Sequence, residues 1–176
     1  GNNSWELSNI RTWLNATEET VVYENGVPAD TAMSEVCNGY EYEPGFLHEF
    51  SEAELARIIE TRVVTEGNVL SEEDTVTLDK VFLLSKEELE WFRDAGIHMV
   101  AKPRETAVAA DESNWYQYYS LDYGVEYYYW WLRTPVEGSA CECYMVTNGY
   151  TSEEVMVNTV GLEGYGIRPA MTIVLE

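Results

Sequence analysis

The order of helix and strand signals along the chain is the feature that most constrains its fold. Helix-start signals lie in the first half, where Ser8 can cap a short helix, and where Ser51 with Glu54 and Ser85 with Glu88 form capping boxes. Strand-like runs separated by turn residues fill the second half. This order predicts an α+β domain with short helices first, antiparallel strands second and many long loops, rather than alternating α/β units.

Apolar spacing gives the expected helices their inward faces. The first helix is expected over 8–15, and the second opens at Ser51. The third opens at Ser85 and ends at Gly96, because glycine favours the conformation that stops a helix. The expected inward-facing residues are Ile10, Trp13 and Leu14 in the first helix, Leu55, Ile58 and Ile59 in the second, and Leu89 and Phe92 in the third.

Alternating and continuous apolar runs predict the strands. Residues 61–64 alternate, and 76–84 contain the apolar run VFLL, which suits a buried strand. The stretches 16–50 and 97–129 lack such patterns and are expected to be irregular. In the second half, the expected strands span 129–133, 141–146, 154–158 and 169–175.

Length and charge limit the classes of partner. A chain of 176 residues fits a single domain over 1–176. Its 32 acidic and 10 basic residues give a net charge of −22, which repels nucleic acid and anionic lipid headgroups. Direct membrane insertion is not expected either, because no stretch reaches the ~18 apolar residues of a span. The acidic surface suits solubility, and calcium is the one cofactor that it leaves open.

Five blocks along nearly the whole chain resemble a bacterial family. The blocks are SNIRTWLN (8–15), FSEAELARIIET (50–61), DKVFLLSKE (79–87), WLRTP (131–135) and GIRPA (166–170). They are similar to a domain of unknown function that occurs in gut-type Gram-positive bacteria, often on secreted or surface proteins. The resemblance implies an extracellular or cell-surface location, and it implies no activity.

The layout of aromatic–Arg turns and a late Gly-aliphatic-Arg segment is in turn similar to the formylglycine-generating enzymes. This second resemblance implies a C-type-lectin-like fold. Members of the bacterial family usually carry an N-terminal hairpin before the first block. This chain begins almost at that block, so we expect the hairpin to be missing.

Three arginines, Arg11, Arg133 and Arg168, stand among apolar or aromatic neighbours. The planar guanidinium has five N–H donors and can bind several carbonyls or a carboxylate at once. We expect these arginines to brace irregular loops. The alternative is that they hold a carboxylate or phosphate ligand.

Aromatic residues crowd the stretch 115–131. Sugar rings stack on Trp and Tyr, although a loop-rich domain can equally fill its core with these rings. Alternation places Tyr128 and Trp130 on one face and Tyr127, Tyr129 and Trp131 on the other, so one set is expected in the core. Because binding residues concentrate on loops, the candidate ligand-binding residues are Trp115, Tyr116, Tyr118 and Tyr119.

The cysteines Cys37, Cys141 and Cys143 form no disulfide framework, because their number is odd. Cys141 and Cys143 are two apart in an expected strand, about 6.5–7 Å from each other, which is too far for a relaxed disulfide. Whether Cys37 pairs with either stays open. The formylglycine-generating enzymes use cysteines in this general region, but the spacing here differs and no histidine is near, so we expect small buried hydrophobes.

These features favour a non-catalytic extracellular recognition domain that binds glycans or another surface protein through aromatic loops. No catalytic motif is present, and no catalytic residue is assigned. One alternative is an enzyme on a formylglycine-generating-like fold, which needs Cys141 and Cys143 exposed and reduced in a pocket. Another is a structural adhesin or scaffold domain, which predicts buried rings.

Overall fold

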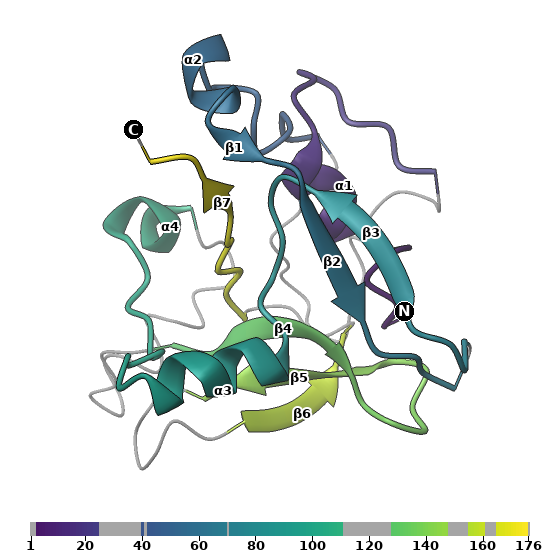
Figure 1. Cartoon of the computed structure of the whole chain (residues 1–176). Helices are drawn as coiled ribbons and strands as arrows, with labels where there is room; N and C mark the ends of the chain where they lie inside the picture. Colours follow the sequence, from purple (N-terminus) through teal and green to yellow (C-terminus); the bar gives the residue numbers. More distant parts are fainter. Residues whose placement is uncertain are drawn as a thin grey trace.

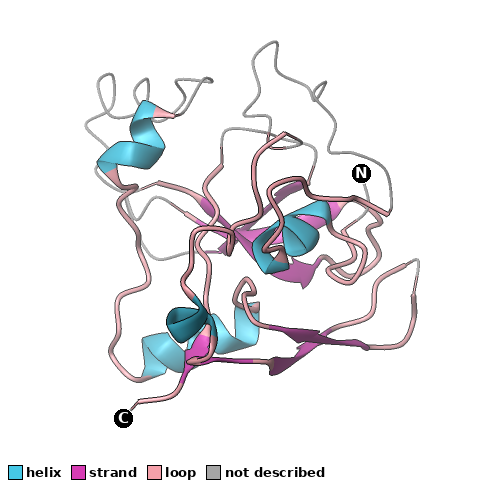
Figure 2. Cartoon of the chain, turned by 90° about the horizontal axis from the view of Figure 1, so that it is seen from above, coloured by secondary structure: helices cyan, strands magenta, loops and turns pink. Residues whose placement is uncertain are grey.

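The fold is that of a computed structural model, which describes residues 3–24, 40, 42–69, 71–110, 128–147, 155–160 and 165–175. Figure 1 and Figure 2 show short helices and short antiparallel strands joined by long loops. The α+β class is therefore confirmed. The elements in chain order are α1 (Asn9–Asn15), α2 (Glu52–Leu55), β1 (Ile58–Ile59), β2 (Thr61–Thr65), β3 (Thr75–Asp79), α3 (Lys86–Asp94), α4 (Glu105–Ala109), β4 (Trp130–Pro135), β5 (Glu142–Val146), β6 (Val155–Thr159) and β7 (Thr172–Ile173).

The strict division into a helical first half and a strand-rich second half is wrong. Three strands, β1 to β3, precede α3, and the helix α4 follows it. Helix α4 lies within the stretch 97–129, for which the sequence predicts only irregular structure. This helix has no side-chain cap at its start, so the capping signal that marks the other helices is missing from its sequence.

Side-chain caps start three helices where the sequence predicts them. The Ser8 hydroxyl accepts a hydrogen bond from the backbone N–H of Arg11 at the start of α1. Complete capping boxes open α2 and α3. In each box the serine hydroxyl and the carboxylate three residues later satisfy backbone N–H groups that the helix leaves unpaired. These starts are confirmed because capping depends on residues close in sequence.

Helix α2 ends earlier than predicted, at Leu55. Ile58 and Ile59 do not extend its apolar face but form β1, which pairs with Ile173 and Thr172 of β7. Isoleucine loses side-chain freedom in a helix and fits a strand better, so the available partner strand decides the conformation.

In α3, Leu89 is fully buried, but Phe92 is 38% exposed. The prediction that both face inward is therefore right only for Leu89. The backbone after the helix is left-handed at Gly96, with φ of 75°, which confirms that this glycine ends the helix.

Strands β2 and β3 form an antiparallel ribbon, in which Thr61 lies opposite Asp79 and Val63 opposite Thr77. Figure 1 shows this ribbon above the second, three-stranded sheet. The later inward-facing positions of both strands are buried, as at Val63 and Thr77, whereas Val64 on the other face is exposed. The ribbon confirms the strand predicted at 61–64.

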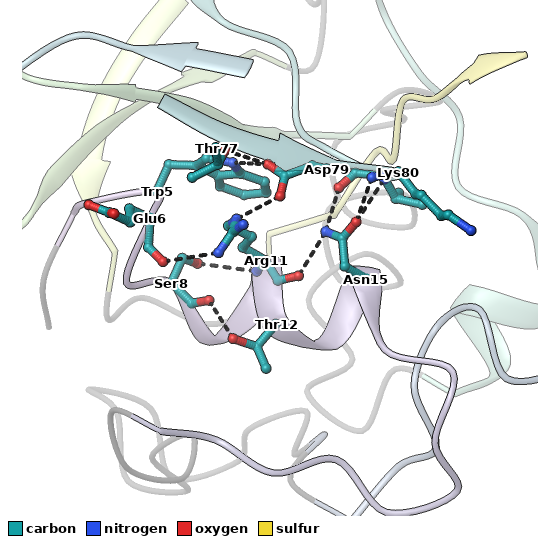
Figure 3. A network of polar contacts seen from close by, with 10 residues as sticks. Trp5, Glu6, Ser8, Arg11, Thr12, Asn15, Thr77, Asp79 and Lys80 are labelled. Carbon is teal, nitrogen blue, oxygen red and sulfur yellow. Dashed lines mark hydrogen bonds and ion pairs between the residues drawn. The ribbon is translucent and has the colours of Figure 1, made fainter. Parts of the chain in front are cut away.

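The apolar run 81–84 is buried, but it is not part of a strand. The predicted strand over 76–84 is therefore wrong beyond the end of β3. The backbone of this run bonds to scattered partners instead of one neighbouring strand. Figure 3 shows the Asn15 side chain of α1 reaching the N–H of Lys80, where the run begins. The partners within the run are Asn15 for Val81, Ala170 for Phe82, and Arg133 for the carbonyls of Leu83 and Leu84.

The three-stranded sheet has the order β4-β5-β6, and all its pairs are antiparallel. The strands predicted at 129–133, 141–146 and 154–158 correspond to it. The register between β4 and β5 shifts between Trp131 and Pro135. The strand predicted at 169–175 is shorter than expected, because only Thr172–Ile173 is a strand.

One hydrophobic core receives residues from all three sheets of the described chain: Ile58 from β1, Val63 from β2 and Trp130 from β4. It gathers Trp5 and Leu14 from the N-terminal segment, Leu89 from α3, and Trp130 and Val146 from the three-stranded sheet. None of the helices in the described ranges has the length and the apolar character that crossing a lipid bilayer requires.

Candidate functional site

The loop residues expected to bind a ligand, Trp115, Tyr116, Tyr118 and Tyr119, lie outside the described residues. The same aromatic run continues into β4, where the structure describes it from Tyr128 onward. The candidate site is therefore built from this end of the run.

Aromatic residues 128–131 alternate between the core and the outer face of β4. Tyr128 and Trp130 are 7% and 2% exposed, whereas Tyr129 and Trp131 are half-buried. The predicted division of this run into two faces is confirmed over these four residues, and Tyr128 and Trp130 form the core set. The outer set keeps part of its ring surface in contact with solvent.

Tyr165 packs edge-on against both outer rings. Its ring centroid lies 5.5 Å from that of Tyr129 and 5.5 Å from that of Trp131, with interplanar angles of 66° and 85°. Edge-to-face contacts of this kind are the geometry that aromatic pairs prefer. We call Tyr129, Trp131 and Tyr165 the aromatic patch. All three rings are half-buried, so they hold one another in place while part of each stays accessible.

Gly166 lets the segment that carries Tyr165 approach β4. Its N–H donates to the Tyr129 carbonyl at 2.9 Å, and its carbonyl accepts from the Trp131 N–H at 3.1 Å. A Cβ atom at this position would lie 3.1 Å from the Tyr129 carbonyl oxygen, which is tighter than ordinary packing. The glycine therefore sets the place of the third ring of the patch.

Asn158 on β6 adds polar groups beside the patch. Its Nδ2 donates to the Tyr165 hydroxyl at 3.1 Å, and its Oδ1 accepts from the Thr159 N–H at 2.9 Å. Partly accessible rings with an adjoining hydroxyl and amide offer both stacking surface and hydrogen-bonding groups. Sites for small polar ligands commonly combine the two.

Arg11 is part of a polar network centred on the buried carboxylate of Asp79 (Figure 3). The Arg11 Nε donates to Asp79 Oδ1 at 2.7 Å. The indole N–H of Trp5 and the hydroxyl of Thr77 both donate to Oδ2, at 2.9 and 2.6 Å. The network ties the N-terminal segment and α1 to β3.

Arg133 is buried and binds the carboxylate of Glu88 with two nitrogens, at 2.6 and 2.7 Å. It also donates to the carbonyls of Leu83, at 2.6 Å, and Val64, at 3.2 Å. One guanidinium thus joins β4 to α3, to the ribbon and to the buried apolar run. The planar guanidinium has several N–H donors in a fixed fork, and the four acceptor oxygens around Arg133 match this geometry.

The pKa of the Glu88 carboxyl indicates how this ion pair responds to pH. Burial by itself raises the pKa of this carboxyl, but hydrogen bonds from Arg133 and the Ser85 backbone, with the charge of Arg133, lower the pKa below its ordinary value of 4.5. A lowered pKa in the folded state contributes stability that is present above the unfolded value and lost as pH falls through the folded value.

We therefore expect the stability difference between wild type and Glu88→Gln to be largest at neutral pH and to shrink on acidification below 4.5. Urea unfolding of both proteins at several pH values measures this difference. The exposed substitution Glu90→Gln, on the same helix, is the control. A difference that stays constant down to about pH 3 would contradict the prediction.

Arg168 contacts the protein in another way. Its Nη1 donates to the Met99 carbonyl at 2.7 Å, and its guanidinium lies 5.1 Å from the centre of the Trp130 ring. Burial lowers the pKa of Arg168 below its ordinary value. Within the described residues, Arg11 and Arg133 each contact a carboxylate and Arg168 does not.

The cysteine pair has unequal environments. Cys143 is buried, with its Sγ 3.8 Å from the Asn3 carbonyl oxygen, whereas Cys141 is half-buried. Burial raises the pKa of Cys143 to about 12, so its thiol stays protonated at neutral pH. Both are free thiols, and Cys37 lies outside the described residues. Within the described ranges, no group of three His, Cys, Asp or Glu residues is arranged to hold a metal ion.

Tyr165 of the patch and the adjoining Asn158 are the site residues that the sequence does not reveal. The glycines around Tyr165 predict only a turn, and a single tyrosine in a turn carries no signal of its own. Asn158 lies inside an expected strand, where nothing marks its contact with Tyr165. Both contacts depend on backbone pairing that only the fold supplies.

A family model described as "Domain of unknown function (DUF6273)" matches residues 1–175. No curated protein and no solved structure matches the chain. The family match covers nearly the whole chain, which confirms the expectation of a domain of unknown function. The chain belongs to the DUF6273 family.

Proposed function

We propose that this chain is a non-catalytic recognition domain that binds a glycan through the aromatic patch, together with the aromatic residues 115–119 that precede β4 in the sequence. The observation that carries the proposal is the set of three half-buried rings packed edge-on beside the Asn158 amide. Trp130 is buried in the core, whereas the three rings of the patch keep part of their surface accessible; Trp131 also packs against the core.

The chemistry of the patch suits a neutral sugar. Sugar C–H groups pack on ring faces, and the hydroxyls can bond to the Tyr165 oxygen and the Asn158 amide. The net charge of −22 repels an anionic polysaccharide. It does not repel a neutral polysaccharide. We therefore infer a neutral glycan rather than an acidic one.

The location and the finer fold belong to the same proposal. We place the domain on the surface of a Gram-positive bacterium and give it a C-type-lectin-like build. The support is the resemblance of the five sequence blocks to surface proteins, and the short antiparallel strands joined by long loops. A binding domain of this kind uses loops for specificity and the strands as a rigid base.

The thiol pair supports the non-catalytic part of the proposal. Cysteine chemistry requires an accessible thiolate, and the buried Cys143 with its raised pKa does not provide one at neutral pH. Chemistry at Cys141 and Cys143 would require this buried thiol to become exposed first.

We expect the substitution Trp131→Ala to weaken glycan binding about tenfold or more, because a central aromatic anchor contributes a large part of binding energy in a recognition site. A glycan array, run with calcium and again with EDTA, finds the ligand, and calorimetry on wild type and variant measures the loss. Binding that disappears with EDTA would add a calcium site to the proposal.

Two further variants separate recognition from folding. Tyr165→Phe keeps the ring and removes the hydroxyl, so it should weaken binding less than Trp131→Ala does. Trp91→Ala removes a tryptophan that is 62% exposed on α3, outside the patch, and should leave binding unchanged. No binding to any neutral glycan in either condition would refute the proposal, and a surface protein as ligand or a structural role would then take its place.

A further inference from the structure

A hollow of about 240 Å³ lies between the end of α3 and the segment that follows the patch. Its apolar lining includes Leu84 and Met99, which are buried, and Phe92 and Ile97, which are exposed. Arg168 supplies the charged part of the lining. The hollow therefore combines apolar walls with one cation, and none of its lining residues is acidic.

Among the described residues, no carboxylate balances the charge of Arg168. Within the described part of the chain, its contacts are the Met99 carbonyl and the Trp130 ring, and no carboxylate pairs with it. The carbonyl takes one of its five N–H donors, which leaves capacity for a bidentate partner. Burial already disfavours the charged guanidinium, so an anion placed here would gain more than one at a fully solvated arginine.

Trp130, which contacts Arg168 but does not itself line the hollow, provides a second observation. Its ring lies beside the guanidinium, and its indole N–H is buried without a hydrogen-bond partner among the described residues. Buried donors are nearly always paired, so an orphan donor calls for an explanation. Counting only partners in the described ranges, the neighbouring side chains of Arg168 and Trp130 thus both have unused hydrogen-bonding capacity.

From these observations we propose that the hollow is a binding site for a carboxylate carried on a compact apolar group. The guanidinium of Arg168 binds the carboxylate, and Phe92, Ile97 and Met99 surround the apolar group. The planar fork of arginine matches the two oxygens of a carboxylate. The Arg168 guanidinium lies over the Trp130 ring, and no residue of the aromatic patch lines the hollow, so the two proposals are independent.

The size and charge of the site restrict the ligand. Pockets for drug-sized molecules measure about 300–1,000 Å³, so this smaller hollow fits one aliphatic or aromatic group. The overall negative charge of the protein repels polyanions over a wide surface. A ligand with a single carboxylate meets only the one local cation. Free small acids and the C-terminal residue of a peptide share this chemistry.

The test is an NMR titration of the whole chain with phenylpropionate, followed through the backbone and indole N–H signals. The indole signal of Trp130 is assigned by its loss in Trp130→Phe. We expect saturable shifts at Trp130 and around Ile97, with a Kd of roughly millimolar order for so small a probe. Phenylpropionamide, which has the same shape without the charge, should bind about tenfold more weakly or not at all.

Two further probes distinguish the sources of the carboxylate. They are an N-acetylated Gly-Gly-Leu peptide with a free C-terminus and the same peptide with an amidated C-terminus. Tighter binding of the free peptide than of phenylpropionate would identify a peptide C-terminus as the ligand. Binding of phenylpropionate alone would identify a small free acid.

Variants locate the site. Arg168→Gln should abolish the shifts, and Ile97→Glu should do the same by placing a carboxylate beside the guanidinium. Because Ile97 is exposed, that second variant tests the site even if loss of the Met99 contact unfolds Arg168→Gln. Arg62→Gln, an exposed arginine on β2, is the control and should leave binding unchanged. Equal shifts from the acid and the amide, or no saturable shift up to about 10 mM acid, would overturn the proposal.

Discussion

Replacing Arg133 with methionine is expected to lower the free energy of unfolding by about 3–5 kcal/mol, the usual cost of breaking a buried ion pair on one side. The substitution fills similar volume but removes the donors that Glu88, Leu83 and Val64 share. It leaves the partly buried Glu88 carboxylate without its cation and two carbonyls without a partner. Methionine cannot offset these losses, because the carboxylate and the carbonyls need hydrogen-bond donors and the thioether is only a weak acceptor.

Three comparisons make this result specific, each measured by urea unfolding at neutral pH. Arg133→Lys keeps the charge but loses the fork, so it should fall between wild type and Arg133→Met. The double variant Arg133→Met with Glu88→Leu should recover part of the loss, because it removes the unpaired carboxylate. Arg62→Met on the outer face of β2 should stay within about 0.5 kcal/mol of wild type. A cost for Arg133→Met below about 1 kcal/mol would contradict the argument.

The parts of the fold that depend on neighbours in sequence could be predicted. Ser51 with Glu54 starts α2 because both partners of the capping box lie within one turn. The same local signal cannot say where a helix ends when a distant strand competes for its residues. Ile58 and Ile59 join β1 because β7, from the other end of the chain, is available to pair with them.

The buried run 81–84 illustrates a different limit. Its apolar residues correctly predict burial, and burial alone does not distinguish a strand from an irregular segment. The side chains of Asn15 and Arg133 bind the backbone of Val81 and Leu83, while backbone groups of Ala170 and Arg133 bind Phe82 and Leu84. No sequence pattern indicates that these scattered partners will take the place of a neighbouring strand.

The candidate site could be predicted only in part, for the same reason. Period-two alternation separates Trp130 from Trp131, because it follows from strand geometry alone. The contact of Tyr165 with Trp131 depends on the backbone pairing of Gly166 with β4. The hollow around Arg168 likewise forms only when the end of α3 and the C-terminal segment come together.

Replacing Asp79 with asparagine is expected to cost about 3 kcal/mol, although the two side chains have nearly the same shape. Both carboxylate oxygens of Asp79 are occupied by donors: Arg11 on one, and Trp5 with Thr77 on the other. An amide has a single acceptor oxygen. Either orientation of the new amide therefore points its NH₂ group at a donor, and the substitution removes the counter-ion of Arg11.

The hydrogen-bond pattern, rather than packing, is what this substitution tests. Thr77→Val removes the hydroxyl that donates to Asp79 Oδ2, and Oδ2 still accepts from the Trp5 indole, so it should cost less, about 1 kcal/mol. Asp94→Asn, at the exposed end of α3, removes a carboxylate that has no such role and should change stability by less than about 0.5 kcal/mol. If thermal unfolding placed Asp79→Asn as close to wild type as Asp94→Asn, the network in Figure 3 would not be what holds the N-terminal segment and α1 to the ribbon. The expected order, with Asp79→Asn lowest and Thr77→Val between it and wild type, follows only if a buried carboxylate accepts all three donors at once.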